Sequence, residues 1–153
     1  MINNSKEKND FIFNWILKNK LAIGTCPTKI EDINLLKHNK VNNILGLCSE
    51  DESKWHKNLE KNFICKRIIL PDSRKKILPL KSEIDYAYNT LSDFVHNNVT
   101  FIHCHAAIER SPLLCIMFVM RKYNIELEES LDYVKSVHNL TNPRNKQLFL
   151  IKN

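Results

Sequence analysis

The chain has 153 residues, of which 43% are hydrophobic and 26% are charged, and its formal net charge is +6. This length supports one buried core but not two ordinary domains, and the balance of apolar and charged residues excludes a disordered chain. The excess of Lys and Arg favours anionic partners, from phosphate esters to nucleic acid or acidic membranes, without choosing among them.

Four short apolar runs are typical of buried strands, and segments with helical periodicity separate them. The runs are residues 21–24, 41–47, 64–70 and 99–103. Strands that alternate with helices predict an α/β fold, with a mainly parallel central sheet of four to five strands flanked by helices. We expect one domain over residues 1–153, in which residues 1–20 form a helix or an arm packed on the core.

Two polar signals mark helix starts in the first half of the chain. Thr28 followed three positions later by Glu31 is the pattern of a capping box, and Ser49 with Glu52 repeats it. Further helices are expected where apolar residues recur at helical spacing, in residues 84–95, 111–123, 127–134 and 148–151.

The cysteines and the N-terminal residues indicate the cellular compartment. Five cysteines are scattered without a Cys-x-x-Cys pair, whereas a secreted disulfide framework needs an even and denser set. The opening MINNSKEKND lacks the apolar stretch of a secretory signal. The longest apolar run, residues 113–120, is too short to span a bilayer. We therefore expect a cytoplasmic protein without a membrane span.

The stretch HCHAAIERSP, residues 103–112, joins the end of a predicted strand to the start of a predicted helix. In open α/β sheets ligands bind at the carboxyl ends of the strands, and the free N–H groups and dipole of a helix N-terminus attract anions. Cys104 at the start of this turn is favoured as a thiolate, and Arg110 can grip two phosphate oxygens. The chemistry indicated is attack of Cys104 on a phosphate ester.

The segment His103-Cys104-x5-Arg110-Ser111 resembles the signature of the cysteine-dependent protein tyrosine phosphatases, and the compact chain looks like their dual-specificity branch. The resemblance implies a parallel sheet ringed by helices, a covalent two-step mechanism, and no metal or other cofactor. It also implies roles. Cys104 would be the nucleophile and Arg110 the clamp on the phosphate and the transition state. Ser111 would help Cys104 to leave in the second step, and His103 would support the thiolate from behind the loop.

The phosphate cradle implied by the resemblance is the backbone of the same loop. Its substrate-binding residues are His105, Ala106, Ala107, Ile108, Glu109 and Arg110. Family loops usually have Gly at the position of Ala107, so either Ala107 adopts a permitted geometry or the loop carries about 1–3 kcal/mol of strain. A Glu109 carboxylate aimed into the cradle would repel phosphate. Because Arg110 must point inward and adjacent side chains diverge, we expect Glu109 to point outward.

The mechanism also needs a general acid that protonates the leaving oxygen and then a base for the incoming water. The family places an aspartate on a separate loop upstream of the cysteine. Asp72 follows an apolar strand and lies 32 positions before Cys104. The competing carboxylates, Asp85 and Asp93, fall inside the next predicted helix. We therefore expect Asp72 to serve as acid and base.

Other interpretations of the loop are weaker. If Cys104 were only a buried core cysteine at a polar helix start, the presence of Arg110 and Ser111 at their positions would be a coincidence. A metal site formed by His103, Cys104 and His105 is disfavoured, because adjacent residues of a strand point to opposite faces and no second cluster supplies ligands.

A group of basic residues flanks the expected acid: Lys66, Arg67, Arg74, Lys75 and Lys76. It is either a solvated face or a funnel for substrates with several negative charges. Aromatic residues do not interleave with it, so we expect no nucleic-acid partner.

The sequence therefore predicts a monomeric phosphatase that hydrolyses phosphate monoesters, with phosphotyrosine, phosphoserine and phosphothreonine in proteins as the leading substrates. Its expected partner is a phosphorylated protein or another anionic phosphoester. Two alternatives stay open. One is a phosphate-binding module without turnover, weakened by Ala107 and Glu109. The other is the same mechanism on a phosphoinositide, a phosphorylated glycan or an RNA 5′ end.

Overall fold

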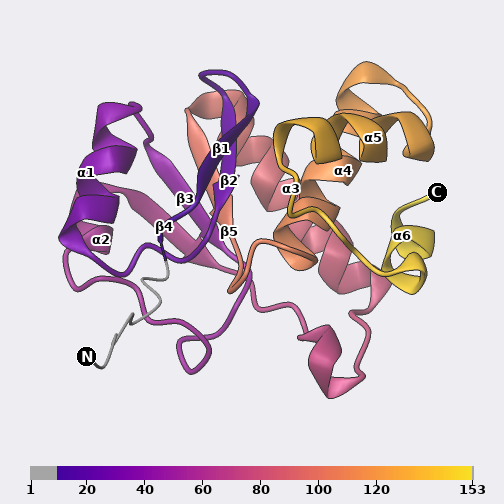
Figure 1. The fold of residues 1–153 in the computed structure, drawn as a ribbon, viewed down its shortest axis with the longest axis horizontal. Helices are drawn as coiled ribbons and strands as arrows, with labels where there is room; N and C mark the ends of the chain where they lie inside the picture. The colour runs from indigo at the N-terminus through magenta and orange to yellow at the C-terminus, as the bar shows by residue number, and fades with distance from the viewer. Residues whose placement is uncertain (1–9, 153) are drawn as a thin grey trace, which may run out of the picture.

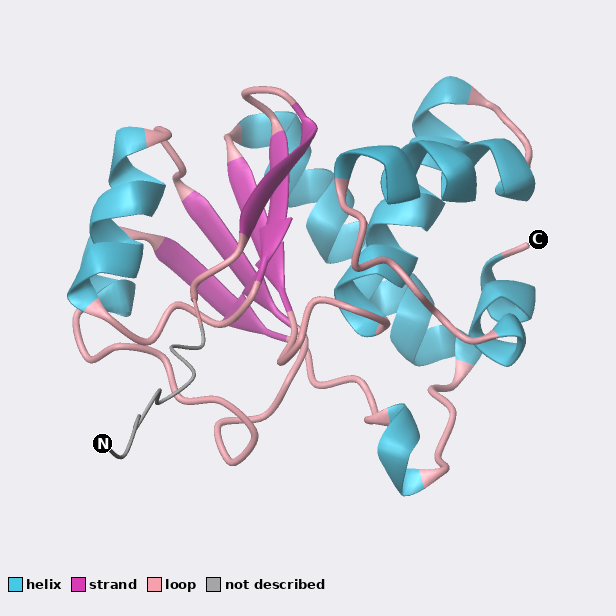
Figure 2. Ribbon diagram, in the orientation of Figure 1, coloured by secondary structure: helices cyan, strands magenta, loops and turns pink. Residues whose placement is uncertain are grey.

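A five-stranded sheet runs through the middle of the structure, a computed structural model that describes residues 10–152 (Figures 1 and 2). Its order is β1-β2-β5-β3-β4, with β1 at Phe13–Leu17, β2 at Leu21–Gly24, β5 at Thr100–His103, β3 at Asn43–Gly46 and β4 at Ile64–Arg67. The pairs β2–β5, β5–β3 and β3–β4 are parallel, whereas β1 runs antiparallel to β2. The predicted fold class, a mainly parallel sheet of four to five strands flanked by helices, is confirmed.

Helices cover both faces of the sheet (Figure 1). One face is covered by α1 (Ile30–His38) and α2 (Leu59–Asn62). The other is covered by α3 (Lys81–Asn97), α4 (Arg110–Tyr123), α5 (Leu127–Val137) and α6 (Asn145–Ile151). A short 3₁₀ helix, η1 (Ser73–Lys75), lies between β4 and α3.

The central strands are buried on both faces, as parallel strands usually are. Successive side chains of a strand point to opposite faces, so each strand contributes to two cores. Leu45 of β3 and Ile102 of β5 belong to the larger core under α3 to α6. Ile44 and Phe101, one position earlier in each strand, belong to the smaller core under α1 and α2. The two cores clamp the sheet and hold the ends of its strands in place.

The N-terminal segment forms a strand where a helix or an arm was expected. Residues 13–17 pair with β2 as a hairpin, with Phe13 opposite Gly24. A Cβ on Gly24 would lie 1.7 Å from the carbonyl oxygen of Ile12, so only glycine permits this close approach. The first nine residues of the expected helix or arm lie outside the described residues.

The helix expected after Ser49 does not form. The Glu52 N–H donates to the Ser49 carbonyl oxygen at 3.2 Å and to its Oγ at 3.3 Å, which closes a turn, and α2 begins only at Leu59. The capping pattern marked a turn because the same side-chain bonds serve turns and helix starts. At the start of α1, the capping carboxylate belongs to Asp32 and not to Glu31.

Three loops meet at the carboxyl edge of the sheet. Gly24 and Gly46, the last residues of β2 and β3, both lie beside His103, the last residue of β5. The loops that leave this edge after β3, β4 and β5 therefore start close together, where open α/β sheets bind their ligands. None of the helices within residues 10–152 combines the length and apolar character needed to cross a membrane.

Candidate active site

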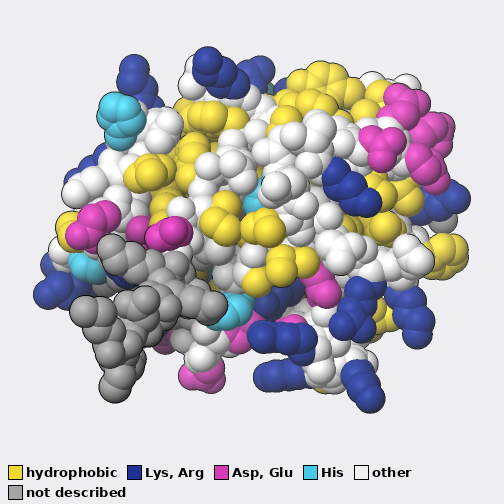
Figure 3. Space-filling model, in the orientation of Figure 1, with side chains coloured by type: hydrophobic (Ala, Val, Ile, Leu, Met, Phe, Trp, Pro, Cys, Tyr) yellow, Lys and Arg dark blue, Asp and Glu magenta, His cyan; other side chains and the backbone are white. Residues whose placement is uncertain are grey.

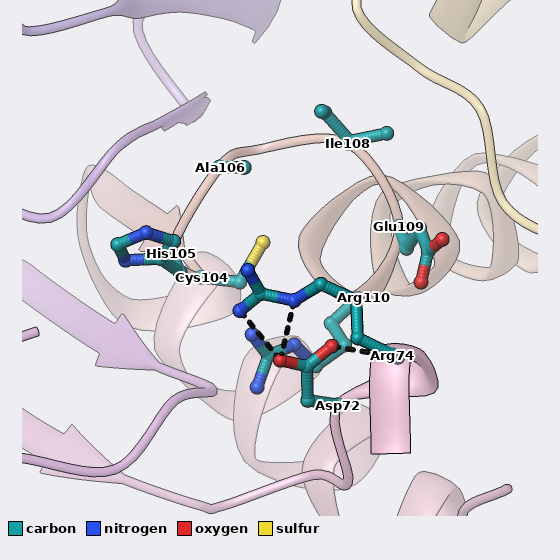
Figure 4. A pocket seen from close by; sticks show the side chains of 8 residues that line it. All are labelled: Asp72, Arg74, Cys104, His105, Ala106, Ile108, Glu109 and Arg110. Carbon is teal, nitrogen blue, oxygen red and sulfur yellow. Dashed lines mark hydrogen bonds and ion pairs between the residues drawn. The ribbon is translucent and has the colours of Figure 1, made fainter. Parts of the chain in front are cut away.

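Cys104 lies directly after β5, at the bottom of a hollow of about 190 Å³ (Figure 4). Cys104 is 2% exposed and is part of the lining of this hollow. The lining brings together the expected nucleophile, clamp and acid with most of the expected cradle: Asp72, Arg74, Cys104, His105, Ala106, Ile108, Glu109 and Arg110. Of the other expected site residues, His103, Ala107 and Ser111 are buried beneath this surface.

Ser111 supports the thiol from the first turn of α4. Its Oγ lies 3.1 Å from the Cys104 Sγ, and the Ser111 side chain is fully buried. Because α4 begins at Arg110, the free N–H groups of its first turn lie next to the sulfur and favour a negative charge there. The hydroxyl can therefore stabilise a thiolate by a hydrogen bond.

His103 is buried behind the loop and is held by two hydrogen bonds. The indole Nε1 of Trp55 donates to its Nε2 at 2.7 Å, so the ring proton is on Nδ1, 3.2 Å from the carbonyl oxygen of Cys104. Burial lowers the pKa of His103 to about 3, so the ring is neutral. Support from His103 is thus a hydrogen bond to the backbone and not a positive charge. A Cβ on Gly46 would lie 2.9 Å from the His103 Nε2, so glycine makes room for this arrangement.

Arg110 is fixed by a carboxylate that the sequence did not single out. Its Nη1 and Nη2 donate to the two carboxylate oxygens of Glu52 at 2.9 and 2.7 Å, and Nη1 also donates to the carbonyl of Leu70 at 3.2 Å. The hydrogen bonds from Arg110 hold the pKa of Glu52 below its ordinary value. The pair is bidentate and mostly shielded from water, so it holds the guanidinium plane at the side of the hollow.

Asp72 lies at the mouth of the hollow and is tied to Arg74 (Figure 4). It caps η1 by accepting from the Arg74 N–H at 3.0 Å, and the Arg74 Nε and Nη2 approach its Oδ2 to 2.8 and 2.6 Å. The hydrogen bond from the Arg74 side chain lowers the pKa of Asp72 to about 2. In this arrangement Asp72 is a carboxylate near neutral pH. Neither Asp85 nor Asp93 lines the hollow.

Ala107 adopts the left-handed conformation, with φ of 59°, at the position where family loops have glycine. An L-residue in this region costs about 1–2 kcal/mol relative to the right-handed one. The strain is held by a chain of hydrogen bonds from two other elements. His138 Nε2 donates to the Ala107 carbonyl at 2.6 Å, and Asn14 of β1 donates to the His138 Nδ1 at 2.9 Å. Because its Nδ1 accepts one hydrogen bond and its Nε2 donates the other, the His138 ring is neutral, and burial lowers its pKa.

Glu109 points away from Cys104, as Figure 4 shows. Its carboxylate accepts a hydrogen bond from the Ser73 hydroxyl and lies 3.4 Å from the Nε of Arg144. The residue therefore sits on the rim of the hollow, and its charge is partly neutralised by Arg144. The repulsion of phosphate that an inward carboxylate would cause is avoided.

The consecutive side chains of the loop entrance diverge. His103 contacts Trp55, Cys104 faces the hollow, and the His105 Nδ1 lies 2.5 Å from the Ser53 Oγ. This divergence speaks against the alternative of a metal site built from the three residues. Within residues 10–152, no group of three His, Cys, Asp or Glu side chains is arranged to hold a metal ion.

The basic group expected around Asp72 is divided by the structure. Arg67 is a structural residue, because it donates to the carbonyls of Cys48 and Ser53 and lies 4.0 Å over the Trp55 ring. Lys66 reaches the hydroxyl of Tyr86 on α3. Of this group, only Arg74 lines the hollow that contains Cys104.

Four residues of the site were not predicted as functional: Asn14, Glu52, Trp55 and His138. Glu52 carried a signal, but it was the signal of a helix cap. Arg74 was predicted only as one of the basic residues that form either a solvated face or a funnel for anionic substrates. Asn14 and His138 are 124 positions apart and meet only after β1 joins the sheet, so no local pattern could reveal them.

Comparison with known proteins agrees with the geometry. Residues 21–153 match the family model described as dual specificity phosphatase, catalytic domain. Dual specificity protein phosphatase 1-B of Xenopus laevis is 30% identical over 91 residues, which cover 56% of this chain and 23% of that protein. A putative tyrosine-protein phosphatase, R622, of Acanthamoeba polyphaga mimivirus is 33% identical over 66 residues, 42% of this chain and 31% of that protein. The chain thus spans less than a third of the length of these relatives.

Solved structures share the fold at low sequence identity. A human tyrosine phosphatase-like serine/threonine/tyrosine-interacting protein aligns with a TM-score of 0.78 and 15% identity, over 91% of this chain and 92% of that one. PTPMT1 in complex with PI(5)P aligns with a TM-score of 0.77 and 16% identity, over 92% of both chains. These likenesses show the fold. The family match, which covers most of the chain and includes the Cys104 to Ser111 loop, shows that the chain belongs to the dual-specificity phosphatase catalytic-domain family.

Proposed function

We propose that this domain hydrolyses phosphotyrosine, phosphoserine and phosphothreonine in proteins through a cysteinyl-phosphate intermediate. The observation that carries the proposal is the shared hollow, in which a thiol, a guanidinium and a carboxylate meet at the N-terminus of α4. Family membership and the names of the curated relatives support a protein substrate.

In the first step, the Cys104 thiolate attacks phosphorus and the bond from phosphorus to the ester oxygen breaks. The phosphate charge lies against the N-terminus of α4 and the guanidinium of Arg110, which Glu52 holds in place. Asp72, in its protonated form, gives its proton to the leaving alcohol or phenol oxygen. The products of this step are the free hydroxyl group and a phosphate bound to sulfur.

In the second step, water attacks the phosphorus while Asp72 accepts one of its protons, and the bond between sulfur and phosphorus breaks. The Ser111 hydroxyl, 3.1 Å from the sulfur, stabilises the departing thiolate by a hydrogen bond. Cys104 and Asp72 return to their starting protonation states, and inorganic phosphate leaves. His103 positions the loop through the Cys104 carbonyl.

Arg74 links substrate binding to the protonation of Asp72. The guanidinium lines the same hollow and its hydrogen bond lowers the pKa of Asp72. A bound phosphate attracts Arg74 away from Asp72 and adds a negative charge beside the carboxylate. Both changes raise the pKa of Asp72 and favour the protonated acid that the first step requires.

The test is hydrolysis of p-nitrophenyl phosphate in the presence of EDTA. We expect turnover by the wild-type domain and a loss of about 10³-fold or more in kcat for Cys104→Ser, because the covalent route is closed. Cys65→Ser, a half-buried cysteine away from the hollow, is the matched control and should retain activity. A rate that is unchanged by Cys104→Ser contradicts the proposal.

A second candidate function is phosphoester binding without turnover. The pairing of Asp72 with Arg74, which keeps the acid ionised, is the observation that favours it. The same assay separates the two functions when it is combined with binding of a phosphopeptide, measured by fluorescence anisotropy. Binding with no product supports this second function, whereas product formation supports the phosphatase.

A further inference from the structure

A second hollow, of about 380 Å³, lies at the end of the sheet opposite the catalytic hollow that contains Cys104. The turn between β1 and β2, the second half of α3 and the end of α4 form it. The Thr100 N–H at the start of β5 donates to the Lys20 carbonyl at this end, whereas the Cys104 loop leaves the other end of β5 (Figure 1). The proposed reaction uses none of the residues that line the second hollow, which include Lys20, Tyr88, Ser92, Phe118, Arg121 and Lys122.

The second hollow is positively charged. Lys20, Arg121 and Lys122 are exposed at its rim, and within residues 10–152 none of them has a carboxylate within 4.0 Å. Figure 3 shows Lys and Arg side chains along the upper edge of the molecule, over the β1–β2 turn. The two cations in the last turn of α4 also complement its helix dipole, but Lys20 lies in a turn between strands and has no such role. Two separate elements thus place three unneutralised charges around one hollow.

Two aromatic rings form an apolar part of the wall next to these cations. The guanidinium of Arg121 lies 4.3 Å from the centroid of the Tyr88 ring, and the Nζ of Lys122 lies 5.9 Å from that of Phe118. Phe118 is buried and Tyr88 is half-buried. Stacking on a ring fixes a guanidinium while its N–H groups stay free to donate. The apolar wall also lowers the local dielectric constant, which strengthens the attraction of the cations for a bound anion.

From this arrangement we infer that the second hollow is a docking site for an acidic segment of a partner protein, rich in Asp and Glu and carrying an apolar side chain. Carboxylates spaced along a segment match three separate cations better than one compact anion does. The planar guanidinium of Arg121 can pair with a carboxylate through two hydrogen bonds. An apolar side chain of the segment would pack on Tyr88 and Phe118. The volume lies in the range of ligand pockets, about 300–1,000 Å³.

Nucleic acid and membranes fit the second hollow less well. Bases stack on open aromatic faces, but Arg121 lies over the ring of Tyr88. Surface binding to a bilayer uses apolar side chains that enter the lipid, whereas Phe118 is buried in the wall of the hollow. Because the second hollow and Cys104 lie at opposite ends of β5, a docked segment leaves the catalytic hollow open. Docking at this end does not require the proposed reaction.

The experiment selects binders of the wild-type domain from a phage library of random peptides and measures the selected peptides by fluorescence anisotropy. We expect enrichment of peptides that combine several Asp or Glu residues with an apolar residue. Their affinity should fall about tenfold in Lys20→Gln/Lys122→Gln, because two partly exposed ion pairs are lost, and it should weaken as salt is added. The matched control is Lys61→Gln/Lys135→Gln, which removes the same charge at two exposed positions outside the hollow and should bind as the wild type does.

Ser92→Trp tests the hollow itself without changing its charge. Ser92 is half-buried in the wall, so an indole there fills part of the space. The affinity for the selected peptides should fall about tenfold or more. Asn89→Trp, exposed on the same helix and outside the lining, is the control and should bind normally. The midpoint of thermal unfolding shows whether each variant is folded, and the charge variant tests the site even if Ser92→Trp does not fold.

Three results would overturn the inference. One is a selection without acidic enrichment. The second is unchanged affinity in Lys20→Gln/Lys122→Gln or in a folded Ser92→Trp variant, and the third is an equal loss in the lysine control. Vesicles of phosphatidylcholine and phosphatidylserine form a further arm: if Lys20 and Lys122 affect only vesicle binding, this face serves a membrane and the inference of a protein segment is wrong. All arms measure binding, so they stay separate from the test of the phosphatase activity.

Discussion

The two loops that face each other across the catalytic hollow are held in different ways. The Cys104 loop is tied to distant elements, because Trp55 contacts His103, Glu52 contacts Arg110, and His138 contacts the Ala107 carbonyl. The loop that carries Asp72 is held mainly by its own neighbour Arg74 and by one contact from Ser73 to Glu109. The side chain of Arg110 is 7% exposed and that of Arg74 is 68% exposed.

This difference matches the tasks of the two loops. A nucleophile and a phosphate clamp act best when their geometry is fixed before the substrate arrives. A residue that gives and later accepts a proton must change its protonation state, and an exposed partner such as Arg74 can move away at low cost. Four substitutions test the comparison.

The largest effect is expected on the acid side of the hollow. Asp72→Asn removes the proton donor, so kcat for p-nitrophenyl phosphate should fall by ~10²–10⁴ while substrate binding persists. The control is Asp93→Asn, an exposed aspartate on α3. If the kcat of Asp72→Asn matches that of the control, Asp72 is only the cap of η1.

Glu52→Gln tests whether the geometry of the Cys104 loop depends on contacts from distant residues. Loss of the charged partner allows the Arg110 side chain to move. A displacement of about 1 Å in a positioned group lowers the reaction rate by up to ~10²-fold, so kcat/KM should fall by about 10- to 100-fold. Inhibition by inorganic phosphate should weaken as well, which a purely structural role would not require. Glu50→Gln, an exposed neighbour, should have no effect. Unchanged phosphate inhibition in Glu52→Gln would count against a positioning role.

Arg74→Ala tests whether the neighbouring Arg74 side chain sets the pKa of Asp72. Without the hydrogen bond from Arg74, the pKa of Asp72 rises from about 2. Because the protonated form is lost as the pH rises through this pKa, the alkaline limb of the kcat/KM profile, which reports the free enzyme, should move to higher pH. The profile is measured with an aryl phosphate well below its KM, and Lys75→Ala, the exposed neighbour, is the control. If the alkaline limb does not move in Arg74→Ala, a group other than Asp72 sets the pKa of that limb.

Ala107→Gly should produce the smallest change, in stability. Glycine relieves the strain of a left-handed residue but increases the freedom of the unfolded chain, so the free energy of unfolding should rise by about 0.5–1 kcal/mol. For a chain of this length the midpoint of thermal unfolding rises by about 2–4 °C for each 1 kcal/mol. Ala106→Gly, where φ is not positive, should lower it. A destabilised Ala107→Gly variant would mean that the greater freedom of the unfolded chain outweighs the relief of strain at this position.

The local patterns of the sequence succeeded where a single segment carries the information. The strand, turn and helix around Cys104 are contiguous, and the spacing from Cys104 to Arg110 reflects one turn of chain. The signal at Ser49 and Glu52 failed as a helix start because a capping bond looks the same in a turn. The partner that Glu52 finds is 58 positions away, and no local pattern contains it.

The sequence by itself determined the fold class, the family and the loop on which the proposed nucleophile and clamp lie, because hydrophobic periodicity and the Cys104 to Ser111 signature are properties of neighbouring residues. Only the tertiary structure decided that His103 is neutral, that Glu109 faces Arg144, and that Asp72 is paired with Arg74. Burial and the direction of side chains depend on which elements pack together. They are set when the sheet brings three loops to one edge, and they decide the protonation of His103 and of Asp72.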